Sequence, residues 1–215
     1  LQSISYQYKF MNPEQGVAYG EQSLELANKL NWKKGQAKSY NSLGGNLFAM
    51  GDFDKSLEYF NKALKLNKSE NNKSEMAKNY SNIGNIYYNL SDYLVALSYF
   101  QKALLLDEET DNKDGIAENL GSIGNIHNGL TNYKNALEYY DKALKLHEET
   151  NNRRGVATVL SNIGIAYYDL KEYEKALIKI RDIWHQPTSP LQTQAQAPIT
   201  EIDTTGSTQE ENHNA

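Results

Sequence analysis

Four histidines and two pairs of adjacent glutamates are the side chains best suited to metal binding or acid–base chemistry in this sequence. The histidines are His127, His147, His185 and His213. No two of them stand three or four residues apart, the spacing that places two ligands on one helix face, so we expect no metal site. The glutamate pairs at 108–109 and 148–149 recur near predicted helix ends, and we interpret them as solvated charge.

Other catalytic motifs are missing from the sequence. It has no cysteine, which excludes disulfides, thiol catalysis and thiolate metal sites. Its glycines form neither Gly-x-Gly-x-x-Gly nor Gly-Lys-Ser/Thr, the loops that hold phosphates. We find no nucleophile that is matched with a base and an orienting group. We therefore predict that the protein is not an enzyme and uses no cofactor.

The glycines instead mark an internal repeat. Gly44, Gly84, Gly124 and Gly164 are spaced 40 residues apart. Aromatic residues at 53, 93, 133 and 173 and alanines at 63, 103 and 143 keep the same step. Repetition at a period of 20–50 residues is typical of a solenoid, in which each unit buries its apolar face only against its neighbours. Such a fold offers a long surface to a partner and seldom a catalytic pocket.

Each unit is predicted to be a pair of helices, which makes the fold all-α. In the second unit, apolar residues at steps of three and four mark one helix face up to Tyr87 and another from Tyr93 to Leu104. We assign units to residues 37–76, 77–116, 117–156 and 157–185, after a partial unit at 1–36 whose second helix covers 13–30. Residues 186–215 hold three of the four prolines and few apolar residues, so we predict a disordered tail.

These positions resemble the tetratricopeptide repeat. The second unit shows the pattern of that family in Tyr80, Ile83, Gly84, Tyr87, Ala96, Phe100 and Ala103. The resemblance covers residues 12–180 and implies an α-solenoid of antiparallel helix pairs curved into a right-handed superhelix. The proline that often ends the second helix in the family is replaced by Lys68, Glu108 or Glu148, so we expect that helix to continue for about another turn. The resulting long period is similar to that of kinesin light chains, the cell-polarity adaptor LGN and many bacterial regulatory proteins.

The resemblance also implies a binding surface, because the first helices of this family line a concave face. The residues expected to contact a partner there are Lys38, Asn41, Lys78, Asn82, Asn85, Tyr88, Asn89, Ser122, Asn125, Asn128, Asn162 and Tyr168. An asparagine amide has both donors and an acceptor, so it can bond a peptide backbone of any sequence. We hypothesise that a ladder of asparagines holds an extended or helical peptide: Asn82, Asn85, Asn125 and Asn162. The alternative is that these are solvated residues on exposed helices.

Charge limits the choice of partner. The net charge is −5, and four acidic residues without a Lys or Arg in 185–215 supply most of it. Residues 1–184 are therefore nearly neutral and have no basic stripe, so we do not expect binding to nucleic acid. No segment approaches the roughly 20 apolar residues of a membrane span. A protein or peptide is the expected partner.

Two other functions are compatible with the sequence. The atypical first and last units lack a polar capping helix, so copies of the chain are able to stack end to end as a homo-oligomer. The chain also begins without Met, which suits the regulatory or sensory part of a longer signalling protein. We expect a cytoplasmic location, and a periplasmic or exported one is open as well.

Overall fold

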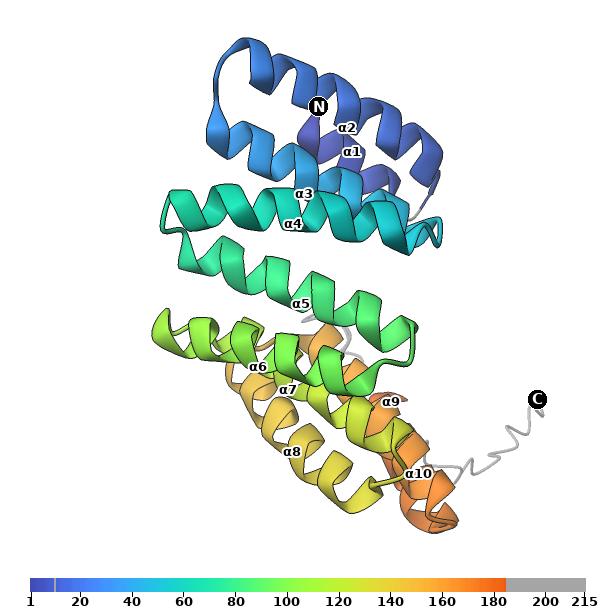
Figure 1. Ribbon diagram of the computed structural model, residues 1–215. Helices are drawn as coiled ribbons and strands as arrows, with labels where there is room; N and C mark the ends of the chain where they lie inside the picture. The colour runs from blue at the N-terminus through green and yellow to red at the C-terminus, as the bar shows by residue number, and fades with distance from the viewer. Residues whose placement is uncertain (10, 185–215) are drawn as a thin grey trace, which may run out of the picture. The chain divides into compact units, whose positions relative to one another are not determined.

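The computed structural model describes residues 1–9 and 11–184, and the predicted tail at 186–215 lies outside this range. Within it the chain forms ten α-helices and no strand, so the all-α prediction is confirmed (Figure 1). The helices are α1 (Gln2–Tyr8), α2 (Pro13–Lys29), α3 (Lys33–Ala49), α4 (Phe53–Ser69), α5 (Lys73–Asn89), α6 (Tyr93–Glu109), α7 (Lys113–Gly129), α8 (Tyr133–Glu149), α9 (Arg153–Asp169) and α10 (Tyr173–Trp184).

The helices follow a strict spacing. Each helix from α2 to α9 has 17 residues, and three residues separate it from the next. A sequence period of 40 is therefore two long helices and two short turns. The second helices continue past Lys68, Glu108 and Glu148, as expected from the missing proline. The first helices α3, α5, α7 and α9 begin four residues before the assigned unit boundaries, for example at Lys73 for the unit assigned to 77–116.

The turns have one backbone geometry throughout. A residue with positive φ, between 48° and 79°, occurs every 20 residues: Asn31, Gly51, Asn71, Ser91, Asp111, Thr131, Asn151 and Lys171. The next N–H donates to the carbonyl five residues back, as from Asn72 to Asn67 at 2.9 Å, which satisfies a carbonyl at the helix end. The Asn72 side chain then caps the next helix by accepting from the Glu75 N–H at 3.3 Å. One motif thus ends a helix and starts another within three residues.

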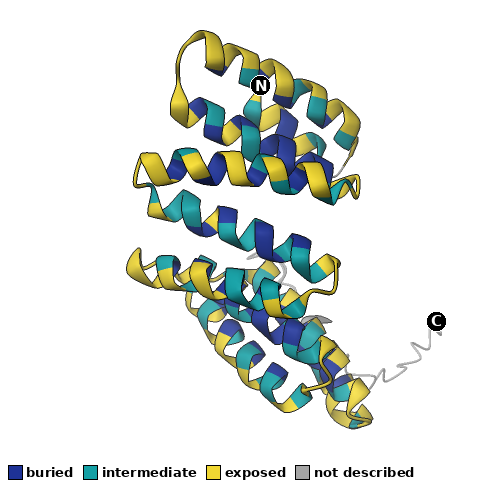
Figure 2. Ribbon diagram, in the orientation of Figure 1, coloured by how far each residue is buried: buried dark blue, intermediate teal, exposed yellow. Residues whose placement is uncertain are grey.

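The core lies between each second helix and the first helix that follows it (Figure 2). Phe60 and Leu64 of α4 pack on Ile83 and Ile86 of α5 in this way. The repeated glycines allow the two helices of a pair to approach closely. A Cβ added at Gly84 would lie 3.0 Å from the ring of Phe100 on α6. Each helix packs on the next along residues 1–184. The first helices also contact one another, α3 with α5, α5 with α7 and α7 with α9.

Candidate functional site

Three hollows lie along the side formed by the first helices. Their volumes are about 590, 270 and 420 Å³, in order from the N-terminal end. Lys78 and Asn82 line the first two, and Glu118 lines all three, so the hollows run into one another. We call them together the groove, and its principal residues are Lys38, Asn41, Lys78, Asn82, Asn85, Glu118, Ser122, Asn125 and Asn162.

Most of the binding residues expected from the sequence lie in this groove. Eight of the twelve line a hollow: Lys38, Asn41, Lys78, Asn82, Asn85, Ser122, Asn125 and Asn162. The tight helix spacing explains this, since residues 40 apart occupy the same place on successive first helices. These eight come together as a continuous surface, although whether they bind a partner stays a prediction.

The other four expected residues do not line the hollows. Tyr88 is half-buried, its ring centre lies 5.6 Å from that of Tyr93, and both rings pack against the core. Asn89 is exposed and donates to the carbonyl of Asn85 at 2.8 Å. The Oδ1 atom of Asn128 is buried and has no hydrogen-bond partner among the described residues. Tyr168 is exposed and meets Tyr173 edge to face, so these four residues form no common site with the groove.

The four asparagines of the predicted ladder differ in their bonding. Asn162 Nδ2 donates to Asn125 Oδ1 at 3.0 Å, and the hydroxyl of Tyr140 donates to the same oxygen at 2.7 Å. Asn125 is therefore held in place from the core side. The side-chain amides of Asn82 and Asn85 make no hydrogen bond within residues 1–9 and 11–184. Both lie in the groove with their donors and acceptors available to a ligand.

A second row of polar residues, which we did not predict from the sequence, lies behind the groove. Asn67 Nδ2 donates to Asn79 Oδ1 at 2.8 Å, and Asn79 in turn donates to the groove residue Asn41. One unit later Ser81 donates to Asn119 Oδ1 at 2.8 Å. Asn67, Asn79 and Asn119 are almost fully buried. The sequence does contain a sign of this row. Residues 39, 79 and 119 are polar, and they share one repeat position at which a helix packed in the core would otherwise carry an apolar side chain.

One member of this buried row is charged. Asp107 accepts from Asn119 at 2.8 Å and from Asn112 at 2.7 Å, and only 2% of its surface is exposed. Burial raises the pKa of Asp107, and the two amide donors oppose that rise. Loss of solvent also raises the pKa of Glu118 in the groove, where Asp114 and Asp107 add repulsion. The middle of the groove is thus the place where acidic groups gather.

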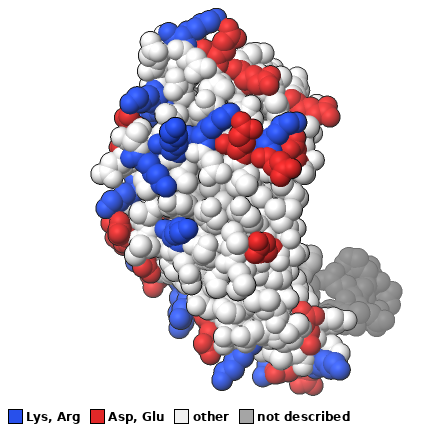
Figure 3. Space-filling model, viewed as in Figure 1, with Lys and Arg blue, Asp and Glu red and all other residues white. Residues whose placement is uncertain are grey.

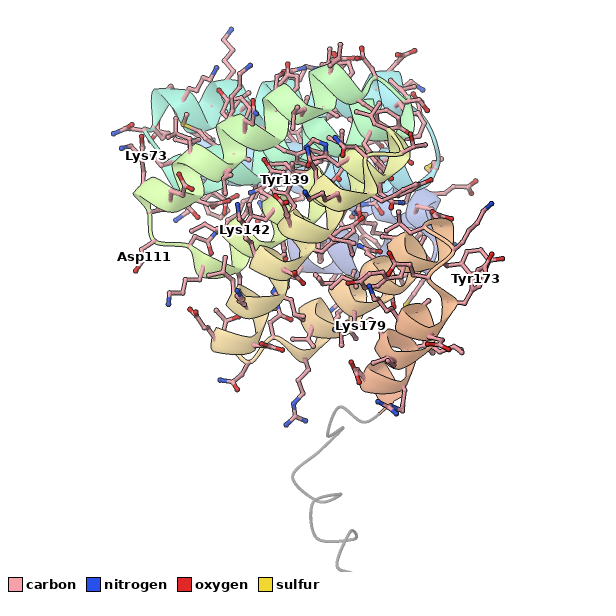
Figure 4. The ribbon with its side chains drawn as sticks, turned by 90° about the horizontal axis from the view of Figure 1, so that it is seen from below. Lys73, Asp111, Tyr139, Lys142, Tyr173 and Lys179 are labelled. Atoms are coloured by element: carbon pink, nitrogen blue, oxygen red, sulfur yellow. The ribbon has the colours of Figure 1, made fainter. Side chains whose placement is uncertain are left out.

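The face of the molecule drawn in the space-filling view (Figure 3) shows no field of a single sign. On the face in Figure 3, charged side chains of both signs gather near the N-terminal helices and at the lower end, and the middle is largely uncharged. Some lysines lie over aromatic rings, as in Figure 4, where Lys142 of α8 is 5.4 Å from the ring centre of Tyr139. Among the described helices, none is both long and apolar enough to cross a membrane.

Tandem helix hairpins with a groove along their first helices define an α-solenoid of the protein-interaction class. Tetratricopeptide repeat family models match residues 37–70, 77–110 and 115–179, which together make up more than half of the chain. The chain belongs to the tetratricopeptide repeat family. This confirms the resemblance that its repeated residues suggested.

Known proteins are similar to this chain in sequence or in fold. Tetratricopeptide repeat protein 29 of Trypanosoma brucei brucei is 33% identical over 57 residues, which cover 26% of this chain and 12% of that protein. The kinesin light chain-type repeats of Podospora anserina superpose with a TM-score of 0.66 at 10% identity, over 85% of this chain and 91% of that one. The Rap conjugation gene regulator of plasmid pLS20, solved in complex with a Phr peptide, superposes with a TM-score of 0.65 at 18% identity, over 78% of this chain and 48% of the regulator. The two structural likenesses concern the fold alone.

Proposed function

We propose that this protein is a non-catalytic scaffold that holds a peptide segment of another protein in its groove. The observation that carries the proposal is the pair of unengaged amides, Asn82 and Asn85, inside a groove whose neighbouring polar groups are already anchored. An unengaged amide next to fixed ones is suited to pair with the backbone of a ligand. The Rap regulator, which was solved with a peptide, supports this by analogy of fold.

Preorganisation is the proposed source of affinity. Asn41 is tied to the buried Asn79, and Asn125 is tied to Tyr140 and Asn162. Because these side chains are already ordered by bonds on the core side, little conformational entropy is lost when a ligand meets them. The 17-residue helices behind them keep the spacing between successive sites constant. An extended or helical segment is the ligand that suits such a regular row.

A peptide library displayed on phage tests the proposal. Peptides selected on the protein are measured by fluorescence anisotropy against the wild type and an Asn82→Ala, Asn85→Ala double variant. We expect the variant to bind roughly tenfold or more weakly, because two hydrogen bonds of about 1 kcal/mol each are lost. The control is Asn89→Ala, which removes an exposed amide outside the hollows. Equal affinity of the double variant and the wild type would rule out the groove as the binding surface.

A specific observation also favours stacking between copies as a second function. Tyr173, Leu177 and Ile180 of α10 are 53%, 65% and 47% exposed. The equivalent residues of α8, such as Leu137 and Tyr140, are covered by the following helix α9. The α10 face is therefore able to receive another helix pair. Sedimentation velocity over a range of concentrations tests this, with Leu177→Glu expected to abolish any concentration-dependent increase in mass.

A further inference from the structure

The exposed face of α10 corresponds to a packing surface that the earlier second helices use inside the chain. At the step of 40 residues, Ile180 follows the positions of Phe60, Phe100 and Tyr140. Those three rings are at most 3% exposed, because each packs on the first helix of the next pair. No helix follows α10 within the described residues, and Ile180 is 47% exposed. The α10 face is therefore one half of an interface that the chain completes elsewhere.

The other half of this interface is exposed on α1, whose register is fixed by Ser5. The hydroxyl of Ser5 donates to the carbonyl of Gly16 on α2 at 2.6 Å. One unit later the same two helix positions meet at Gly44 and Ser56, where the Ser56 hydroxyl donates to the Gly44 carbonyl at 2.8 Å. Because Ser56 follows Gly16 by 40 residues, Ser5 takes the place of the repeat glycine in the first pair.

Ile4 therefore matches the residue that precedes each repeat glycine. The residues at this position in the later first helices are at most 2% exposed: Leu43, Ile83, Ile123 and Ile163. The three isoleucines pack on the second helix that comes before their own. No helix precedes α1 within the described residues, and Ile4 is 40% exposed. Leu1, one turn earlier on the same helix, is also exposed.

We propose that copies of this chain join head to tail, with α10 of one copy packed on α1 of the next as α4 packs on α5 within the chain. The occupant of the α10 face is thus a second copy, which supplies Leu1 and Ile4. The contact repeats the packing of Phe60 on Ile83, with Ile180 and Ile4 in their places. The proposal rests on the stacking proposed above as a second function, and it adds which two surfaces meet.

The packing inside the chain favours this arrangement over a symmetric contact between two α10 helices. Within residues 1–9 and 11–184, second helices pack only on first helices, and no second helix contacts another. Consecutive helices run antiparallel across their short turns, so the last residues of a first helix lie against the first residues of the second helix before it. The seven residues of α1 match those last residues, and Tyr173 and Leu177 are among the first of α10. A contact between two different surfaces leaves one of each free, so the assembly is able to grow.

Two variants that each disable one surface test the proposal by mixing. Leu177→Glu places a charge on the α10 face and Ile4→Glu places one on the α1 face, and a charge buried in an apolar contact is costly. Both residues are exposed, so we expect both variants to fold, which circular dichroism checks. In sedimentation velocity the wild type should gain mass with concentration, and each variant alone should stay a single chain. Their equimolar mixture should form a complex of two chains and nothing larger, because one intact face of each kind remains.

The control is Leu94→Glu, since Leu94 is 79% exposed on α6 and belongs to neither surface. This variant should associate as the wild type does, and loss of its association would contradict the assigned surfaces. A mixture of the first two variants that forms no complex would overturn the head-to-tail contact. Association of Ile4→Glu, but not of Leu177→Glu, would show that two α10 faces meet and would keep the stacking alone. A wild type that stays a single chain at every concentration would overturn the stacking as well.

The absence of native cysteine allows an independent check by cross-linking. Ile4→Cys and Ile180→Cys each place one thiol on one of the two surfaces, and a disulfide between them needs Cα atoms within about 7 Å. With an oxidant present, linked dimers should form in the mixture of the two variants well above the level in either variant alone. Leu94→Cys mixed with Ile180→Cys gives the level due to random collision. Dimers in Ile180→Cys alone that match those in the mixture would contradict the proposal.

Discussion

The side-chain amide of Asn119 donates a 2.8 Å hydrogen bond to the buried carboxylate of Asp107. One unit earlier the bonding runs the other way, because Asn67 donates to Asn79 and Asn79 donates to the groove. A carboxylate can only accept, so Asp107 forces the amide of Asn119 to turn its oxygen toward Ser81. Asp107 stands where the preceding unit has Asn67. This one change decides whether the groove-side residue accepts the hydrogen bond, as Asn41 does, or donates it, as Ser81 does.

Replacing Asp107 separates the role of its charge from that of its hydrogen bonds. Asp107→Asn keeps an acceptor for Asn112 and allows Asn119 to turn over, while it removes a desolvated charge. We expect the urea midpoint of this variant at neutral pH to be unchanged or higher. Asp107→Ala leaves two donors without an acceptor and should cost about 1–3 kcal/mol. Equal losses in the two variants would show that the carboxylate itself is required.

His147 should make the protein less stable in mild acid. Burial lowers the pKa of His147 below its ordinary value of 6.5, although Asp114 opposes that effect. At pH values between the pKa of His147 in the folded chain and its pKa in the unfolded chain, the unfolded chain binds more protons. The free energy of unfolding therefore falls as the pH falls below about 6.5. His147→Asn should therefore lose less stability than the wild type from about pH 7.5 to about pH 5.5. Asp107 and Glu118, whose pKa values are raised, act in the opposite sense in both proteins.

Denaturant melts of His147→Asn and the wild type at both pH values measure this difference. Since the acidic groups are common to the two proteins, the comparison isolates the histidine. Parallel losses of stability would mean that His147 is protonated as easily in the folded protein as in the unfolded one.

Two glycines one turn apart on α7 should respond oppositely to alanine. A Cβ at Gly124 would lie 2.6 Å from the ring of Tyr140 and 3.3 Å from the carbonyl of Ala136, so Gly124→Ala forces the helices apart. We expect a loss of about 1–3 kcal/mol from this overpacking. A Cβ at Gly121 meets nothing within 4 Å, and Gly121→Ala should gain about 0.5–1 kcal/mol through helix propensity. Thermal melts of both variants measure these changes. A Gly124→Ala variant as stable as the wild type would contradict the close approach of α7 and α8 at Gly124.

The turn at Thr131 should be improved by glycine. Thr131 has a φ of 59°, a left-handed conformation that is unfavourable for a β-branched residue. Thr131→Gly should raise the free energy of unfolding by up to about 1 kcal/mol, after the entropy cost of glycine is subtracted. Asn151→Gly, at a φ of 55°, is the control and should change it less, because asparagine tolerates this conformation. Equal effects at the two turns in thermal melts would show that the branched side chain is not strained.

The helix pairs and most of the groove could be predicted from the sequence because contacts in a solenoid are local. Gly84, Phe100 and their equivalents recur at 40 residues, and each helix packs mainly on the one before and the one after it. The first helices begin four residues before the predicted unit boundaries, of which those at 37 and 77 coincide with the starts of two family-model matches. The left-handed turns at Asn31, Asn71, Asp111 and Asn151 set these earlier starts.

The repeat, the family and the face that the first helices present all follow from the order of the amino acids. Which polar groups are engaged and which are open depends instead on how the helices pack. The side chain of Asn79 bonds Asn41, 38 residues away, whereas the side-chain amide of Asn82 on the same helix makes no hydrogen bond among the described residues. The Nδ1 atom of His147 likewise has no hydrogen bond among the described residues, since Val159 stands where the preceding unit has Asn119, whose amide donates to Asp107. Hydrogen bonds need donor and acceptor within about 3 Å, and only packing in three dimensions determines that proximity.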